Sequence, residues 1–363
     1  MVLWAVTTSL LAALLVVASP APGTQAQGAD DCIAPFGVEG CWQVDLFDTF
    51  NGDEIDRNVW EPGWFVDEGY SVSVNNRENA CYNTDQVQVA NGTLQIRLDT
   101  TADPACLDKQ GDAVGLVGGI VSSRDAIRNE AHDGRLDADF YVEARIRVPE
   151  QDGKIVNWPA FWTNGFGPWP ATGEIDILEG LGGDAKFNYH YQCSNGRSCQ
   201  RGAQRHPRDA ADGEWHTYGA LRRLPTLDAP ATITFFFDGI EVATVEERIV
   251  RSPHYIIFTY TSHQDENPIA PGSTMMVDWV RSWSLAETDT GDASCSDGVD
   301  VVDALVIAQY TAGVRSDSGG CPLIDPATQL FADAGDVNGD GRTDILDALT
   351  VAQCSVGVPN ASC

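Results

Sequence analysis

The sequence predicts an all-β protein, an antiparallel β-sandwich, followed by a small α-helical module. From Trp42 onward, short runs alternate polar and apolar residues between Gly, Asn and Asp, as is typical of such sandwiches. Asn91-Gly92 lies within one of these runs and is a strong signal for a hairpin turn. After Leu285 the composition shifts to Asp, Gly and Ala, and a helical pattern at 302–314 recurs at 346–358.

The expected strands follow one another at short intervals. The run 139–148, DFYVEARIRV, shows most clearly the alternation of a half-buried strand. Other such runs occupy residues 43–50, 86–98, 232–245, 255–261 and 274–283. We therefore expect the sandwich to fill residues 32–286 and the helical module to fill 290–363.

The charge of the chain restricts its partners. Asp and Glu number 53 against 22 Lys and Arg, a formal net charge of −31. Such a surface repels phosphate backbones and anionic membranes, so we expect neither nucleic acid nor a membrane as a partner. A neutral substrate fits this charge. A sulfated one would need a local basic patch, for which the arginines at 197–208 are the obvious candidate.

Residues 1–26 are typical of an export signal. Their apolar stretch is too short to span a membrane comfortably, and Thr24-Gln25-Ala26 ends in a small-x-Ala cleavage pattern. The 10 cysteines all follow this segment, which agrees with a secreted protein and an oxidising compartment. Spacing favours local disulfides without fixing the connectivity: Cys32–Cys41, Cys81–Cys106 and Cys193–Cys199, with the remaining cysteines in the tail. Zinc binding is the less favoured alternative, since no CxxC pair occurs.

The segment 173–180, GEIDILEG, places three carboxylates close together. Its alternation favours a β-strand in which Glu174 and Asp176 share one face. In a regular strand Glu179 would point into the core, and burying a lone carboxylate costs several kcal/mol. A one-residue β-bulge near Ile177–Leu178 would return Glu179 to the carboxylate face, and bulges are common beside active sites.

Three carboxylates on one face can support glycoside hydrolysis. Mutual repulsion raises at least one pKa, so a protonated acid can face an ionised carboxylate near neutral pH. That pair is the one needed to cleave a glycosidic bond. A solvated charged strand face is the alternative interpretation, but Trp158, Phe161, Trp162 and Trp169 lie just upstream, and sugar rings stack on aromatic faces.

The motifs WPAFW (158–162), GEIDILEG (173–180) and NYHY (188–191) resemble glycoside hydrolase family sixteen, in its laminarinase-like β-1,3-glucanase branch. The resemblance covers Trp42 to Trp283. It implies a jelly-roll, concanavalin A-like sandwich and a retaining endo-hydrolase. It also implies that Glu174 is the nucleophile, Asp176 the carboxylate that tunes it, and Glu179 the acid/base.

Five further residues are candidates for sugar binding. The resemblance implies that His190 contacts sugar near the cleavage point and that Asn76 lies at the non-reducing side. Trp158 and Trp162 are divided between packing and stacking, with Trp158 favoured as the sugar contact. Trp169 lies in a Gly/Pro-rich loop, where a large aromatic has little to pack on and can form a sugar platform.

The second helical copy follows a calcium-loop motif, DVNGDGRTDILD (336–347). The ligand positions 1, 3, 5, 7, 9 and 12 of an EF-hand loop fall on Asp336, Asn338, Asp340, the Arg342 carbonyl, Asp344 and Asp347. The first copy has serines at two of these positions, so we expect it to bind calcium weakly or not at all. The duplication resembles a type I dockerin module, which implies a cohesin-type scaffold partner. A calcium-folded cap or a surface-attachment module is the alternative.

Together these observations predict a secreted, calcium-stabilised, retaining endo-β-1,3-glucanase acting on laminarin-type glucan. Mixed-linkage β-1,3-1,4-glucan or a galactan such as agarose is the alternative substrate. A non-catalytic glucan-binding protein is the alternative from another class. A second calcium on the sandwich, with Asp278 as one candidate ligand, is suggested by the family resemblance.

Overall fold

The computed structural model describes residues 34–38, 42–66, 68–125, 130–131, 134–136, 139–225, 230–263, 268–285, 293, 300–314, 337 and 342–355. The predicted export signal and the predicted pair Cys32–Cys41 lie outside these ranges. The first strands are β1 (Trp42–Asp48), β2 (Glu61–Pro62), β3 (Tyr70–Ser71), β4 (Cys81–Asn83), β5 (Val87–Ala90), β6 (Thr93–Thr100), β7 (Leu116–Ser122), β8 (Arg124–Asp125), β9 (Glu130–Ala131), β10 (Arg135–Leu136) and β11 (Phe140–Arg147).

The remaining strands are β12 (Glu150–Gln151), β13 (Lys154–Ile155), β14 (Trp158–Gly165), β15 (Glu174–Leu181), β16 (Asp184–Gln192), β17 (Ser198–Arg205), β18 (Trp215–Arg223), β19 (Thr232–Phe237), β20 (Ile240–Val245), β21 (His254–Thr261) and β22 (Ser273–Leu285). Short 3-10 turns cover Thr84–Gln86 (η2) and Arg208–Ala211 (η3), and the tail holds helices α1 (Val301–Thr311) and α3 (Ile345–Ser355). The all-β sandwich with a helical module is therefore confirmed.

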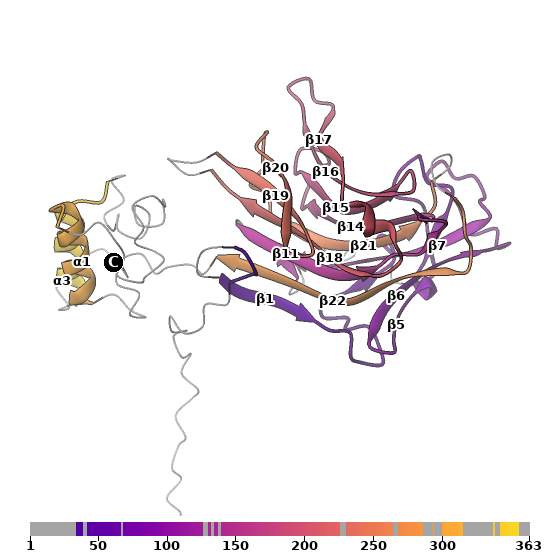
Figure 1. Ribbon diagram of the computed structural model, residues 1–363, viewed down its shortest axis with the longest axis horizontal. Helices are drawn as coiled ribbons and strands as arrows, with labels where there is room; N and C mark the ends of the chain where they lie inside the picture. Colours follow the sequence, from indigo (N-terminus) through magenta and orange to yellow (C-terminus); the bar gives the residue numbers. More distant parts are fainter. Residues whose placement is uncertain are drawn as a thin grey trace, which may run out of the picture.

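Most of the strands form two antiparallel layers that pack on one another. In Figure 1, β1, β22, β6 and β5 lie along the lower edge, and β16 and β17 lie near the top. One layer runs β5–β6–β22–β11–β18–β19–β20, with β1 also paired to β22. The other runs β2–β7–β21–β14–β15–β16–β17, with β10 also paired to β21. The acidic segment forms β15, which lies inside the second layer between β14 and β16.

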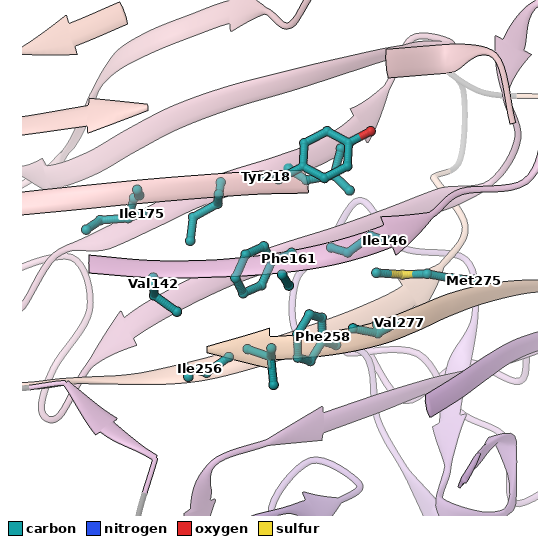
Figure 2. Close-up of a cluster of buried hydrophobic side chains, with 14 of the residues drawn as sticks. Val142, Ile146, Phe161, Ile175, Tyr218, Ile256, Phe258, Met275 and Val277 are labelled. Carbon is teal, nitrogen blue, oxygen red and sulfur yellow. The ribbon is translucent and has the colours of Figure 1, made fainter. Parts of the chain in front are cut away.

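The core lies between these layers, as Figure 2 shows. On β11 the residues Phe140, Val142, Ala144 and Ile146 are fully buried, whereas Glu143 and Arg147 on the opposite face are not. The predicted alternation is therefore confirmed except at Tyr141, which is buried in a separate apolar cluster. Side chains from both layers meet in this core: Val142, Ile146, Tyr218, Met275 and Val277 from the first, and Phe161, Ile175, Ile256 and Phe258 from the second. Each fully buried large apolar side chain contributes about 1.5–3 kcal/mol, which fixes the face that each strand turns inward.

Disulfides join two of the predicted cysteine pairs. Cys81 bonds to Cys106 and Cys193 bonds to Cys199, so both predictions are confirmed. The second disulfide lies in the β16–β17 hairpin, which extends beyond the sheet in Figure 1. Cys354 in α3 is also disulfide-bonded.

The two tail helices pack on one another through a small apolar core of their own. This core contains Ala293, Ala304, Val306, Ile307, Ala348 and Val351. Each helix begins beside a pair of aspartates, Asp300 and Asp303 for α1 and Asp344 and Asp347 for α3. In the part of the chain that the structure describes, no helix is long and apolar enough to cross a membrane.

Candidate active site

The predicted β-bulge is present in β15. On the β16 side, Asp176 pairs with Asn188 and Glu179 pairs with Lys186, so β15 has one residue more than its partner between the two pairs. On the β14 side, Asp176 pairs with Trp162 and Leu178 with Phe161, which leaves Ile177 without a partner residue on either strand. Ile177 is the extra residue. Glu174, Asp176 and Glu179 therefore share one face, which we call the carboxylate face.

The start of β15 is fixed by a tight turn. Gly173 precedes Glu174 with a φ of +79°, and a Cβ there would lie 2.6 Å from Cγ2 of Val250. Both facts exclude larger residues, because a side chain would be strained and would collide with its neighbour. The turn closes the loop 166–173, which joins β14 to β15 and carries Trp169.

His190 lies among the carboxylates from the neighbouring strand. Its Nε2 atom is 3.2 Å from Oδ2 of Asp176 and 3.7 Å from Oε1 of Glu174. Burial alone would lower the pKa of His190, but the hydrogen bond to Asp176 and the charges of the three carboxylates outweigh burial and raise that pKa to about 9. His190 is thus cationic near neutral pH and offsets part of the negative charge of the site.

Both glutamates have raised pKa values. Burial, followed by the charge of Asp176, raises the pKa of Glu174 to about 8 and that of Glu179 to about 7. The charge of His190 opposes this rise in both cases. The two carboxyls therefore compete for protons, and near neutral pH the cluster keeps at least one proton.

Two tryptophan side chains donate hydrogen bonds to the glutamates. Trp169 bonds to Glu174 and Trp158 bonds to Glu179, and each bond lowers the pKa of its carboxyl. Trp169 is 50% exposed, and its ring centroid lies 6.2 Å from that of His190. The structure therefore places an exposed aromatic side chain beside Glu174, where the sequence predicts a sugar platform.

Trp158 and Trp162 are both almost fully buried. Trp158 is 9% exposed, and its ring lies 5.0 Å from that of His263. Trp162 is 7% exposed, and its indole N–H donates to Oγ1 of Thr259 at 2.9 Å. Both lie on the carboxylate face of β14, since their strand positions alternate with the core residue Phe161. Sugar contact by either residue stays a prediction.

Asn76 is exposed and lies in the turn that follows β3. The neighbouring Glu78 is buried and accepts hydrogen bonds from Asn75 and from the hydroxyl of Tyr82. Burial raises the pKa of Glu78 to about 7. Glu78 therefore holds this segment together, and sugar contact by Asn76 stays a prediction.

Residues on β16 that the sequence did not single out complete the carboxylate face. Lys186 pairs with Glu179, and its charge lowers the pKa of that carboxyl. Asn188 pairs with Asp176, and its Nδ2 atom lies 2.9 Å from Nε2 of His190. The signal was available in DAKFNYHYQ, where Lys186 and Asn188 alternate in step with His190.

Asp278, a candidate ligand for calcium on the sandwich, is engaged elsewhere. Its Oδ2 atom lies 2.6 Å from Nη1 of Arg145 on the adjacent strand. This ion pair is partly exposed, and calcium binding by Asp278 stays a prediction. Among the described residues, the acidic group with metal-like spacing is Glu174, Asp176 and His190, where the histidine is cationic near neutral pH.

The tail fits calcium at the end of its second loop. Asp347 is fully buried at the start of α3 and accepts the Asp344 N–H at 2.7 Å, while Asp344 accepts the Leu346 N–H at 2.8 Å. A buried carboxylate beside a second one suits a hard cation that binds oxygen. Asp336, Asn338 and Asp340 lie outside the described residues, and Arg342 is described and exposed.

Comparison with known proteins gives two family matches in different parts of the chain. Residues 120–217 match the family model described as XgeA-like, catalytic GH16 domain, and residues 290–354 match the Dockerin type I domain. The first match includes β14 to β17 and all three carboxylates.

Two curated relatives are glucanases. The chain is 28% identical over 157 residues to glucan endo-1,3-beta-glucosidase A1 of Niallia circulans, a match that covers 40% of this chain and 20% of that protein. It is 31% identical over 150 residues to glucan endo-1,3-beta-glucosidase of Cryptopygus antarcticus, covering 39% of this chain and 47% of that protein. The matched stretch thus spans less than half the length of either relative.

A solved structure shows the same fold. The endo-beta-1,3-glucanase from Pyrococcus furiosus aligns with a TM-score of 0.51 and 22% identity, covering 70% of this chain and 100% of that chain. The family match over residues 120–217 identifies a catalytic domain of the glycoside hydrolase class. The chain carries a catalytic domain of glycoside hydrolase family sixteen, similar to endo-1,3-β-glucanases, and a C-terminal dockerin type I domain.

Proposed function

We propose that this protein is a secreted retaining endo-glycosidase that hydrolyses β-1,3-glucan. The observation that carries the proposal is the bulged strand β15, because the extra residue Ile177 brings Glu179 to the same face as Glu174 and Asp176. Retaining glycosidases need two carboxyl groups on one site, one as nucleophile and one as acid/base.

In the first step, Glu174 acts as the nucleophile. Its ionised carboxylate attacks the anomeric carbon and forms a glycosyl ester while the bond to the glycosidic oxygen breaks. Glu179 gives its proton to that oxygen, so the leaving chain departs as an alcohol. The reaction uses the form of the pair in which the shared proton lies on Glu179.

In the second step, Glu179 acts as the base. It takes a proton from water, the water oxygen attacks the anomeric carbon, and the ester bond to Glu174 breaks. Glu174 is again a carboxylate and Glu179 again carries a proton. Two displacements at one carbon return the original anomeric configuration.

Asp176 and His190 set the charge for both steps. Burial and, after it, the charge of Asp176 raise the pKa of both glutamates and so keep a proton in the cluster. The cationic His190 opposes this effect and stabilises an ionised Glu174, whose Oε1 atom lies 3.7 Å from Nε2. Together, Asp176 and His190 thus allow one glutamate to be protonated while the other is ionised.

The proposed substrate is a neutral β-1,3-glucan. The two curated relatives are named as endo-1,3-β-glucosidases, which supports this linkage. Two of the four arginines at 197–208 are paired with carboxylates, Arg201 with Glu247 and Arg205 with Asp184, which weakens this segment as a basic patch for a sulfated polymer. Trp169, half exposed beside Glu174, supplies an aromatic platform for a sugar ring.

Product analysis of the secreted protein tests this proposal. Short laminari-oligosaccharides from laminarin, with no products from barley β-glucan, agarose or κ-carrageenan, are the expected result. Cleavage of mixed-linkage glucan or of a galactan would keep the mechanism and overturn the substrate. Binding to glucan without any products would indicate a non-catalytic binding protein.

We also propose that the tail binds calcium and docks onto a cohesin-type partner. The dockerin type I match and the buried aspartate at the start of α3 support this. The proposed ligands are Asp336, Asn338, Asp340, the Arg342 carbonyl, Asp344 and Asp347, and the proposed domains are 32–286 and 290–363. When bound, calcium would neutralise the buried carboxylate and stabilise the loop before α3.

A further inference from the structure

The bulge in β15 leaves the backbone carbonyl of Ile177 in need of a hydrogen-bond donor from outside the strand. Ile177 lies opposite no residue on β14 or β16, so its backbone lies outside the regular pairing of the ladder. It is also fully buried. A buried carbonyl needs a hydrogen-bond donor, and its loss typically costs about 1–3 kcal/mol.

His206 supplies that donor. Its Nε2 atom lies 2.8 Å from the carbonyl oxygen of Ile177. A carbonyl only accepts, so Nε2 carries the proton. Among the described residues, Nδ1 of His206 has no hydrogen-bond partner, as expected for the unprotonated nitrogen of a neutral ring.

The surroundings of His206 keep it neutral and fixed. Burial lowers the pKa of His206 to about 4, so the ring is uncharged over the working range of the site. Its ring lies 5.0 Å from that of Phe187 and 5.2 Å from that of Tyr218. Its backbone N–H donates to the carbonyl of Ala185 on β16. Side chain and backbone therefore connect β15 to β16 on the core side of the sheet.

We propose that His206 is a positioning residue for the acid/base: by holding the carbonyl of the extra residue Ile177, it keeps Glu179 on the same face as Glu174. This inference rests on the proposed glycosidase activity. His206 touches none of the three carboxylates in the described contacts, so it acts through the backbone of β15. Side chains alternate between the two faces of a regular strand, so without the extra residue Glu179 would point toward the core.

Two matched variants test whether the hydrogen bond to the Ile177 carbonyl matters, because they carry the same amide donor on side chains of different length. His206→Gln places an amide N–H close to the position of Nε2, whereas His206→Asn carries the same group on a shorter side chain. A cavity of about 270 Å³ that His206 lines gives room for either replacement. Tyr218→Phe is the control, since it removes a buried hydroxyl that donates to Ala210, in the same cluster, without touching Ile177.

The readout compares substrates with poor and good leaving groups. A dinitrophenyl glycoside needs no proton from Glu179 in its first step, so misplacement of Glu179 slows laminarin hydrolysis far more than release of dinitrophenol in the first turnover. We expect His206→Asn to lower kcat on laminarin by about 30- to 100-fold, the cost of an ångström-scale misplacement. Its first-turnover release of dinitrophenol should change less than about threefold, and His206→Gln should recover most of the laminarin activity.

A second readout does not depend on activity. The Glu179 carboxyl, followed by carbon-13 NMR, should titrate with a changed pKa in His206→Asn, because both its burial and its distance from Asp176 change, and should titrate as in wild type in Tyr218→Phe. Equal losses on both substrates, a loss in Tyr218→Phe as large as in His206→Asn, or an unchanged Glu179 titration would each overturn the positioning role. A wild-type protein without activity would overturn the proposed function instead, and the titration would still report on His206.

Discussion

Nε2 of His190 lies 3.2 Å from Oδ2 of Asp176, on a face that carries two further carboxylates. This contact joins adjacent strands, because His190 belongs to β16 and Asp176 to β15. It brings the cationic His190 against one of the three carboxylates. The protonation of both glutamates depends on this balance, and so does the pH range of the proposed reaction.

Replacement of Glu174 and replacement of Glu179 should give variants with different products in the presence of azide. Glu174→Ala and Glu179→Ala should each lower laminarin hydrolysis by about 10²- to 10⁴-fold, since one lacks the nucleophile and the other the acid/base. Added azide should restore cleavage of a dinitrophenyl β-glycoside by both variants. The azide product should have the α configuration from Glu174→Ala and the β configuration from Glu179→Ala. If Glu174→Ala gave the β azide and Glu179→Ala the α azide, Glu179 would be the nucleophile and Glu174 the acid/base. Near-wild-type activity of either variant would contradict the assignment.

Activity on laminarin should fall as pH rises through the range 7 to 8, because the pKa of Glu179 is about 7, that of Glu174 is about 8, and the reaction needs a proton on the pair. In Asp176→Asn burial still raises both pKa values, but the charge of Asp176 that adds to this rise is absent. The falling limb of kcat/KM should therefore move to lower pH. A limb at unchanged or higher pH would show that Asp176 does not hold the proton in the cluster.

Glu179→Gln should make the sandwich more stable at alkaline pH. The folded-state pKa of Glu179 is raised from the ordinary 4.5 to about 7, so its stabilising contribution is complete below pH 4.5 and is lost as pH rises through 7. A glutamine does not ionise. The variant should gain on the order of 2 kcal/mol over wild type at pH 8 and almost nothing at pH 4.5.

Tryptophan fluorescence measures this difference during thermal unfolding, since no tryptophan follows Trp283 and the signal reports on the sandwich. Glu54→Gln, at an exposed carboxylate, is the control for charge removal. A gain for Glu179→Gln that is independent of pH would contradict the raised pKa.

The tail should lose calcium affinity when Asp347 is replaced. Asp347 and Asp303 accept the same kind of hydrogen bond at the start of their helices, from Asp344 N–H at 2.7 Å and from Asp300 N–H at 2.6 Å. Asp347→Ala and Asp303→Ala thus lose the same capping bond, but Asp347 belongs to the loop with the complete ligand spacing. Calorimetric titration with calcium should show at least about a tenfold loss for Asp347→Ala and a smaller one for Asp303→Ala. Equal losses would mean that capping alone explains the effect.

The features that the sequence predicts best are local. The bulge follows from the mismatch between the alternation of 173–180 and the position of Glu179, and this conflict lies within eight residues. Cys193 and Cys199 lie close along the chain, so their disulfide needs little further information. Asp344 and Asp347 precede a helix in their own motif, where capping is a local matter.

The features that escaped prediction depend on which distant segments meet. His206 reaches Ile177 only because β17 ends beside β16, and no spacing in the sequence reveals this. Asp278 pairs with Arg145 because β22 and β11 are neighbours, and no pattern in the sequence predicts that contact. Trp162 is covered by Trp64, whose ring lies 6.2 Å away in a loop from an earlier part of the chain.

The anomeric configuration of the first product tests the central claim most directly. Proton NMR of laminarin digestion, recorded within the first minutes, distinguishes the newly formed reducing ends before they equilibrate. If Glu174 and Glu179 act as nucleophile and acid/base, the β anomer should form first and the α anomer should appear later by mutarotation. Initial formation of the α anomer would mean a single displacement by water and would contradict the role of Glu174 as nucleophile.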